Sequence, residues 1–408
     1  MRRLAWLSFS LSAVILVAGV STIMALRAGA ALPPATNGGP QTEAAAVQPA
    51  PATATADAEK LACPTATETI SLTATATATP IPTATPTATP AYQPAAPAVE
   101  LTGFTHSWQT WNNCGPATLA MLLSYYGSRL SQGDIAAVLR PNYDDKNADP
   151  EELAAFAISQ GLRAVVGVQG DRDTLRLLLS NGLPVLIATW HEPEPDDGMG
   201  HYRLLTGYED AQGYYIVFDS YDTVGLRGAN PYLGLALPYD ELESMWTVFN
   251  RAFVVVYTAD QEPVVDGILG PEAGTPAMWE AALARAEEHA QAHPDDVYAW
   301  FNVGTNLTHL GRYEEAVEAY RRAEAIGWPR RMLWYQVGPM EAYYHVGAYD
   351  KVIALTDQVM RQTNQVEEVW YWRGMALRAL GQADAARQAF ERSLSLRPSY
   401  APPREALQ

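Results

Sequence analysis

The residues best suited to chemistry in this sequence surround Cys114, one of only two cysteines among its 408 residues. Cys114 stands in the run Trp-Asn-Asn-Cys-Gly-Pro-Ala and directly precedes an apolar, helix-like segment at 118–126. A thiol at the start of a helix faces the positive end of the helix dipole, which lowers its pKa and favours the nucleophilic thiolate. A free cysteine is also a common small core residue, so the choice between nucleophile and core depends on the rest of the chain.

A histidine and an aspartate, His201 and Asp219, form the second group of candidate residues. A short turn at 209–213 separates the strands expected at 201–208 and 214–219, which should therefore pair as a hairpin. Pairing about that turn places His201 opposite Asp219 or its neighbour. An aspartate beside an imidazole fixes the tautomer of the ring and stabilises its cation, as the third residue of a catalytic triad does.

Three other side chains compete for these roles. His191 is an alternative base, but it lies in a loop and has no carboxylate opposite it in the predicted hairpin. Asp222 follows the strand and is an alternative to Asp219, and His106 lies near the thiol in an irregular segment. Without a catalytic role, His201 would be a hydrogen-bonded core histidine and Asp219 a strand-end cap. The ordered set of a glutamine, a cysteine, a histidine and an aspartate favours the catalytic interpretation.

The elements expected to position these residues are helices followed by strands. Capping residues and apolar runs predict the helices, and β-branched and aromatic content predicts the strands. The expected helices are 114–126, 131–139, 149–160 and 171–180, and the expected strands are 163–168, 184–189, 201–208, 214–219 and 253–257. Helices followed by a mostly antiparallel sheet indicate an α+β domain, which we place at residues 100–260.

The motifs resemble those of the bacteriocin-processing peptidases, a family of papain-like cysteine peptidases that cut leader peptides after a double glycine. The resemblance rests on Gln-x4-Cys-Gly-Pro-Ala-x-Leu-Ala-Met at 109–121, on a Gly-His-Tyr strand with a Gly-Tyr end at 200–208, and on a strand that ends in Asp219. It covers residues 101–258. Carried over by position, the family's roles are nucleophile for Cys114, general base for His201, orientation of that base for Asp219 and donation to the oxyanion for Gln109.

The sequence also departs from the founding members of that family. They carry an acidic residue before the cysteine, where this chain has Asn113, and they are fused to transporter and ATPase domains. We therefore expect a cysteine-type peptidase of the stand-alone exported branch, whose substrates vary. Two alternatives stay open, an inactive binding module and an acyltransferase with the same triad. No cofactor is expected, and no metal site, because the histidines are scattered and no Cys/His pair has ligand spacing.

A glycine and aromatic pattern repeats in the C-terminal third of the chain. Gly-x-Tyr-x-x-Ala at 311–316 recurs in related form from Gly347 and from Gly381. This resembles the tetratricopeptide repeat, in which small and aromatic residues let paired helices interlock. We expect about three and a half repeats at 275–402, after a linker at 261–274. Their concave groove is expected to bind a peptide substrate or a protein partner, although most of the aromatic residues serve packing.

The N-terminal part of the chain predicts export. Two arginines precede an uncharged, mostly apolar run at 4–26, which is long enough to cross a bilayer and reads as a signal anchor or a cleaved signal peptide within residues 1–30. The Ala/Thr/Pro-rich segment at 31–99 is expected to be a disordered stalk. The folded domains would then lie outside the cytoplasm, tethered to the membrane or secreted.

The remaining cysteine and the overall charge narrow the possible functions. Cys63 falls in the stalk, so Cys114 has no structural disulfide partner, and an exported protein that keeps a free thiol in a folded domain favours chemistry. The net charge of −18 argues against nucleic acid as a partner and against broad adhesion to anionic lipids. Membrane contact is expected through the N-terminal helix only.

Overall fold

The computed structural model of the chain describes residues 91–408. The signal or anchor segment expected at 4–26 and most of the expected stalk lie outside the described residues. Within residues 91–408, no helix combines the length and the apolar composition that a membrane span requires. All the described residues belong to a single compact unit of the chain.

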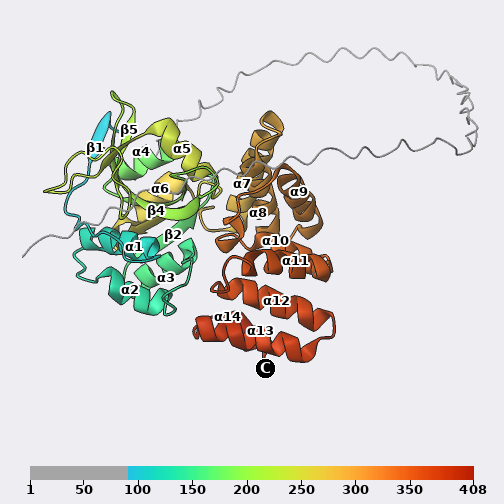
Figure 1. The fold of residues 1–408 in the computed structure, drawn as a ribbon. Coiled ribbons are helices and arrows are strands. Elements are labelled where there is room, and N and C mark those ends of the chain that lie inside the picture. Colours follow the sequence, from blue (N-terminus) through green and yellow to red (C-terminus); the bar gives the residue numbers. More distant parts are fainter. Residues whose placement is uncertain (1–90) are drawn as a thin grey trace, which may run out of the picture. The chain divides into compact units, whose positions relative to one another are not determined.

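A seven-stranded sheet forms the centre of the first folded region (Figure 1). Its strand order is β2-β7-β3-β4-β5-β6, with β1 paired to β4, and its pairs are antiparallel. The strands are β1 (Ala98–Glu100), β2 (Arg163–Gly167), β3 (Val185–His191), β4 (Met199–Glu209), β5 (Tyr214–Phe218), β6 (Leu235–Pro238) and β7 (Phe253–Tyr257). The five predicted strands are confirmed. The short strands β1 and β6 were not predicted, and β1 begins inside the segment assigned to the stalk.

Helices cover both faces of this sheet. One face carries α1 (Cys114–Tyr125), α2 (Gln132–Leu139) and α3 (Pro150–Ser159), and the other carries α4 (Arg172–Ser180), α5 (Tyr239–Thr247) and α6 (Glu262–Leu269). Neighbouring strand residues alternate between the two cores, so that Leu204 packs with the first group and Leu205 with the second. A sheet buried on both faces needs such continuous apolar strands. The predicted α+β domain is therefore confirmed.

Helix α1 is buried along most of its length. Nine of its 12 residues are buried, which explains why its sequence is apolar on every side. It begins at Cys114, as predicted, and its N-cap residue Asn113 makes no side-chain capping bond. Helices α2 and α3 instead begin with capping boxes at Ser131 and Asp149. Residue types at the starts of α2 and α3 thus set where these two helices begin.

The segment expected to be a linker, 261–274, contains helix α6, so that part of the prediction is wrong. Val265 is buried against the core that α4 and α5 share, and Ile268 and Leu269 pack beside it. These residues recur at helical spacing, which is the signal that the linker assignment overlooked. The helix ends at Gly270, whose φ of 76° is a conformation that glycine adopts at little cost.

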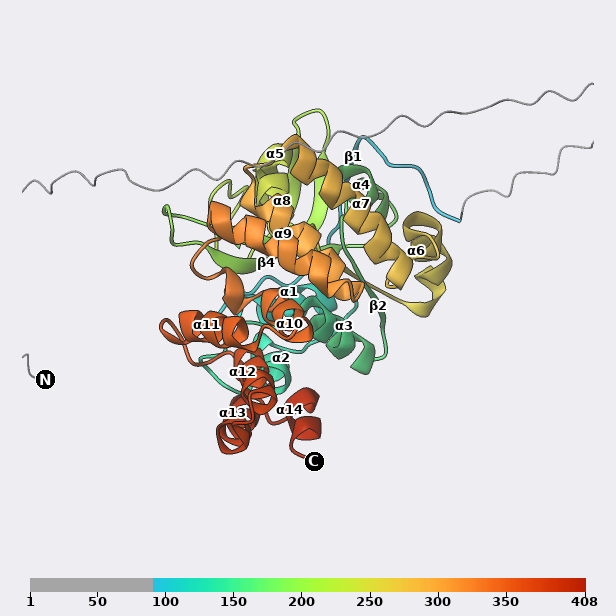
Figure 2. The ribbon, with the colours of Figure 1, turned by 90° about the vertical axis from the view of Figure 1, so that its right-hand side faces the viewer.

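From residue 276 onward all regular secondary structure is helical, and Figures 1 and 2 show these helices in gold to red. They are α7 (Pro276–Ala292), α8 (Val297–His309), α9 (Tyr313–Ile326), α10 (Gly338–His345), α11 (Tyr349–Met360), α12 (Glu367–Ala379), α13 (Ala383–Leu396) and α14 (Ala401–Ala406). Small residues let paired helices approach closely. A Cβ added at Gly304 would lie 2.6 Å from the ring of Tyr320, and one at Gly374 would lie 2.5 Å from the ring of Phe390. These two contacts occupy equivalent places in the helix pairs α8–α9 and α12–α13, which the pair α10–α11 separates.

Candidate active site

Cys114 occupies the first position of α1, where the first turn of the helix leaves backbone N–H groups without intrahelical partners. Polar contacts hold the segment before it in place. The Asn113 side chain is buried, donates to Gln132 Oε1 at 2.7 Å and accepts from Arg140 at 2.9 Å. Asn113 therefore stands where the family's founding members carry an acid, and here it accepts from a buried arginine as a neutral amide.

The strand pair β4–β5 brings His201 and Asp219 together. Asp219 Oδ1 lies 2.9 Å from His201 Nε2, and both side chains are buried. The predicted register is wrong in detail, because the strands pair Glu209 with Tyr214 at the turn, and a change of register between Leu205 and Gly207 removes only part of the difference. Continuing the observed pairing places Arg203 level with Asp219. His201, two residues earlier and on the same side of β4, reaches the carboxylate as a diagonal neighbour.

The thiol of Cys114 and the imidazole of His201 line the same cavity and shift each other's pKa. Burial alone would raise the pKa of Cys114, but the hydrogen bond and charge of His201, aided by the Tyr202 backbone and Arg140, bring it below its ordinary value. Burial opposes the charged form of His201, yet Asp219 and Cys114 outweigh it and raise the pKa of His201 to about 9. These shifts favour a thiolate–imidazolium pair.

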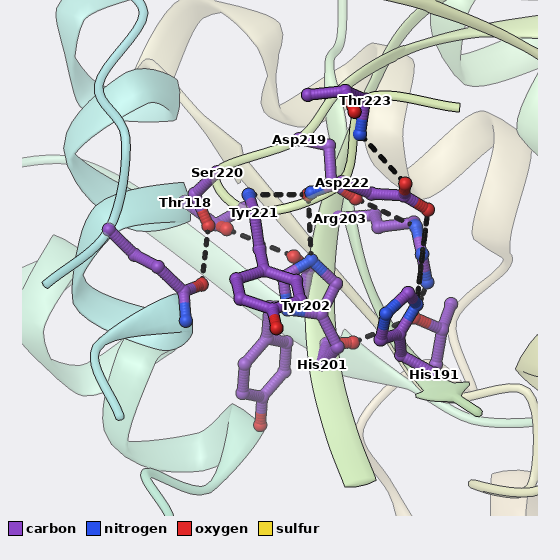
Figure 3. A network of polar contacts seen from close by, with 12 residues as sticks. Thr118, His191, His201, Tyr202, Arg203, Asp219, Ser220, Tyr221, Asp222 and Thr223 are labelled. Carbon is purple, nitrogen blue, oxygen red and sulfur yellow. Dashed lines mark hydrogen bonds and ion pairs between the residues drawn. The ribbon is translucent and has the colours of Figure 1, made fainter. Parts of the chain in front are cut away.

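The Asp219 carboxylate is held ionised by a dense set of partners (Figure 3). Besides His201, its Oδ1 accepts from the backbone N–H groups of Tyr221 at 2.7 Å and Asp222 at 2.8 Å. Arg203 Nε approaches Oδ2 at 2.9 Å as an ion pair. Burial would raise the pKa of Asp219, but His201 and Arg203 hold it well below its usual range.

Arg203 is the residue of this site that sequence reasoning missed. Its side chain is fully buried, and besides Asp219 it donates to Thr189 Oγ1 at 2.6 Å and lies 3.4 Å from Asp222. The only signal was a cation at an inward position of a strand that is otherwise apolar. A buried arginine needs carboxylate partners, so an arginine at such a position predicts that aspartate or glutamate side chains are buried next to it.

Gln109 is attached to the segment that follows Asp219. Its backbone N–H donates to Ser220 O at 2.8 Å, and its Oε1 accepts from Ser220 Oγ at 2.9 Å. This fixes the side-chain oxygen, while the amide nitrogen has no hydrogen-bond partner among residues 91–408. The amide is thus oriented with its donor end unused. Its role at the oxyanion stays a prediction.

The three competing residues have other partners. His106 Nε2 lies 2.7 Å from the backbone oxygen of Asp219, and its ring stacks on Tyr232 at 3.5 Å, so it supports the backbone of the site. His191 lies 3.3 Å from Arg203, and burial followed by that positive charge lowers its pKa. Asp222 pairs with Arg203 and lies 3.9 Å from His191. Of these three histidines, His201 is the one that lines the cavity together with Cys114.

A cavity of about 590 Å³ opens beside Cys114 and His201. Its lining comes from two regions of the chain, the α1–α3 side of the first region and the later helices α7 to α10. Cys114 itself is half-buried at this cavity. Within residues 91–408, no group of three or more His, Cys, Asp or Glu side chains is arranged to hold a metal ion.

Comparisons with known proteins identify both regions. Residues 100–251 match the model of the Peptidase C39-like family, and residues 277–330 and 367–400 match models of the tetratricopeptide repeat. The chain carries a C39-like domain and tetratricopeptide repeats. Both resemblances drawn from the sequence motifs are thereby confirmed. No curated protein sequence matches the chain.

Solved structures of both kinds resemble parts of the chain. A putative C39-like peptidase from Bacillus anthracis is 17% identical over 40% of this chain and 98% of its own, with a TM-score of 0.32. A double glycine motif protease from an AMS/PCAT transporter, in complex with the leader peptide, is 19% identical over 40% of this chain and 95% of its own, with a TM-score of 0.29. MamA from Desulfovibrio magneticus RS-1 is 18% identical over 32% of this chain and 72% of its own, with a TM-score of 0.29.

The C39-like domain and the repeats meet through buried polar contacts. Asn250 Nδ2 donates to Asn306 Oδ1 at 2.7 Å, and Asn302 Nδ2 donates to the Thr247 carbonyl, also at 2.7 Å. All three asparagines are buried. Buried amides left without partners would be costly, so these pairs specify one way of docking the repeats onto the domain.

Proposed function

We propose that the chain is a cysteine peptidase that hydrolyses peptide bonds, with Cys114 as nucleophile, His201 as general base and acid, and Asp219 as the residue that orients His201. The observation that carries this proposal is the buried His201 imidazole, which is hydrogen-bonded to Asp219 and lines the same cavity as Cys114. Because Nε2 of the ring is hydrogen-bonded to Asp219, Nδ1 is the nitrogen that exchanges a proton with the thiol in this proposal. The match to the C39-like family supports the same reaction class.

In the proposed reaction the Cys114 thiolate attacks the carbonyl carbon of the scissile bond. The carbonyl oxygen takes up negative charge, which the unpaired N–H groups at the start of α1 and the Gln109 amide would stabilise. The His201 imidazolium gives its proton to the departing amine as the C–N bond breaks, leaving an acyl-enzyme. The neutral imidazole then takes a proton from water, the hydroxide attacks the thioester, and the thiolate leaves.

A diverse peptide library incubated with the full chain tests this function. We expect cleavage products with the wild type, none with Cys114→Ala and unchanged cleavage with His293→Ala, which alters an exposed histidine in the repeat region. Peptide capture without turnover would contradict hydrolysis and favour the binding-module alternative. Amide products formed only in the presence of an added amine would indicate acyl transfer.

The proposed place of action is outside the cytoplasm, with the chain tethered or exported by its N-terminal apolar run at 4–26. The two arginines before that run support this orientation. Protease added to intact cells should digest the repeats if the proposal holds, and full protection until the membrane is broken would contradict it.

A further inference from the structure

The cavity beside Cys114 continues along the repeat helices. On that side it is lined by Thr305 and Thr308 of α8, by Tyr320 of α9 and by Gly338 and Glu341 of α10. Gly338 packs directly on the Tyr320 hydroxyl, which would lie 2.5 Å from a Cβ at that position, and Thr308 Oγ1 is 3.3 Å from the same oxygen. These contacts join three helices into one surface, here called the repeat wall. The repeat wall and the candidate active site therefore share a single space.

The repeat wall reaches the reacting groups through Tyr335, which precedes α10 and also lines the cavity. The Tyr335 ring packs on the backbone of Gly200, and its ring carbons would lie 3.0 Å from a Cβ there. Burial raises the pKa of Tyr335, and the charge of Cys114 raises it further, so the phenol lies within electrostatic reach of the sulfur. A substrate bound at Cys114 thus meets a side chain contributed by the repeats.

Glu341 is the carboxylate of the repeat wall. It is half-buried in the cavity, and its carboxylate makes no hydrogen bond or ion pair with any of residues 91–408. Burial is what raises its pKa. Desolvating a carboxylate without a counter-charge is costly, and a cation supplied by a ligand offsets that cost through a charge-assisted hydrogen bond.

The other charged residues that line the cavity are of both signs. Arg140 is occupied by Asn113 and by backbone carbonyls. Lys146 lies 5.7 Å over the ring of Trp111, near the start of α1. Across from the repeat wall, helix α3 contributes Glu151, whose carboxylate forms no ion pair within residues 91–408. Carboxylates without an ion-pair partner within residues 91–408 therefore line the cavity from both α3 and α10, and Lys146 is a cation of the same lining.

We propose that the repeat wall is the substrate-binding wall of this peptidase and that Glu341 selects peptides that carry a lysine or arginine side chain. The inference rests on the proposed function for its cleavage step, whereas the binding step stands without it. Cys114 and Glu341 line the same cavity, so one bound peptide can present its scissile bond to the first and a basic side chain to the second.

The test compares matched peptides that differ at one position, lysine against norleucine, a neutral side chain of similar length. We expect the wild-type chain to cleave the lysine peptide with the higher kcat/KM. Glu341→Gln should lower kcat/KM for that peptide by about tenfold or more, mainly through KM, because a charge-assisted hydrogen bond is lost. Cleavage of the norleucine peptide should stay within about twofold, since an apolar side chain makes no such bond. The control Glu314→Gln alters an exposed glutamate of α9 and should change neither value.

Binding measured on Cys114→Ala separates this inference from the proposed function. Fluorescence anisotropy should show tighter binding of a labelled lysine peptide, and the double variant with Glu341→Gln should lose that preference. Equal affinity for both peptides in Cys114→Ala overturns the inference, even if the wild type cleaves them. A lysine preference in binding without any cleavage by the wild type sustains the inference and overturns the proposed function.

Discussion

Replacing Arg203 by methionine tests whether this buried arginine stabilises the Asp219 carboxylate and, through it, His201. Methionine keeps much of the volume but removes the charge that pairs with Asp219 Oδ2 at 2.9 Å inside the fully buried network. Removing one partner of a buried ion pair costs roughly 3–5 kcal/mol of unfolding free energy. Asp219 keeps His201 and two backbone N–H groups on its other oxygen, so we expect about 3 kcal/mol, at the low end of that range.

The same change should move the pH dependence of peptide cleavage. The His201 pKa is raised to about 9, so the protonated ring and the stability it contributes are fully present below the ordinary pKa of His201 and are lost as the pH rises through about 9. Arg203 opposes that charge, so Arg203→Met should shift the alkaline fall in kcat/KM to a higher pH. Arg203→Lys retains the charge and serves as the control, with a fall near the wild-type position.

Urea unfolding and a pH series of kcat/KM provide the two readouts for the full chain. The reasoning predicts a less stable Arg203→Met protein whose alkaline limb moves upward. An unfolding free energy within about 1 kcal/mol of wild type, together with an unmoved alkaline limb, would refute it, because the buried pair would then support neither the fold nor the charge of the imidazole.

Three further predictions address the orienting carboxylate, the oxyanion donor and the repeat packing. Asp219→Asn removes the main cause that raises the pKa of His201, so the alkaline limb of kcat/KM should fall below about 9; an unmoved limb would exclude the orienting role. Gln109→Ala should lower kcat by roughly 10²–10³-fold with little change in KM, measured by steady-state kinetics; unchanged kcat would remove it from the oxyanion site. Gly304→Ala should cost roughly 1–3 kcal/mol in urea unfolding by overpacking, whereas Gly133→Ala in α2, where the nearest atom is 3.5 Å away, should be neutral or stabilising.

Local signals in the sequence were sufficient for much of the fold. Ser131 and Asp149 cap helices where their residue types predict, and Cys114 begins α1 after a non-helical asparagine. The hairpin that carries His201 follows from one turn and two β-rich runs. These features depend on residues close together in the chain, which is why they could be predicted.

What could not be predicted depends on contacts between distant segments. The change of register between Leu205 and Gly207 carries no composition signal, and it decides that Arg203 lies level with Asp219. The repeat side of the cavity was also missed, because it exists only once Tyr335 packs against Gly200, 135 residues earlier in the chain. Neither contact follows from periodicity or propensity.

The pH dependence of Cys114 alkylation tests the catalytic claim most directly. Iodoacetamide labelling of the full chain, located at Cys114 by mass spectrometry, would be followed in the wild type and in His201→Ala. We predict a wild-type midpoint below the ordinary thiol pKa of about 8.5, and a His201→Ala midpoint above the wild-type value because burial then dominates. The same midpoint in both proteins would contradict the thiolate–imidazolium pair on which the proposed peptidase depends.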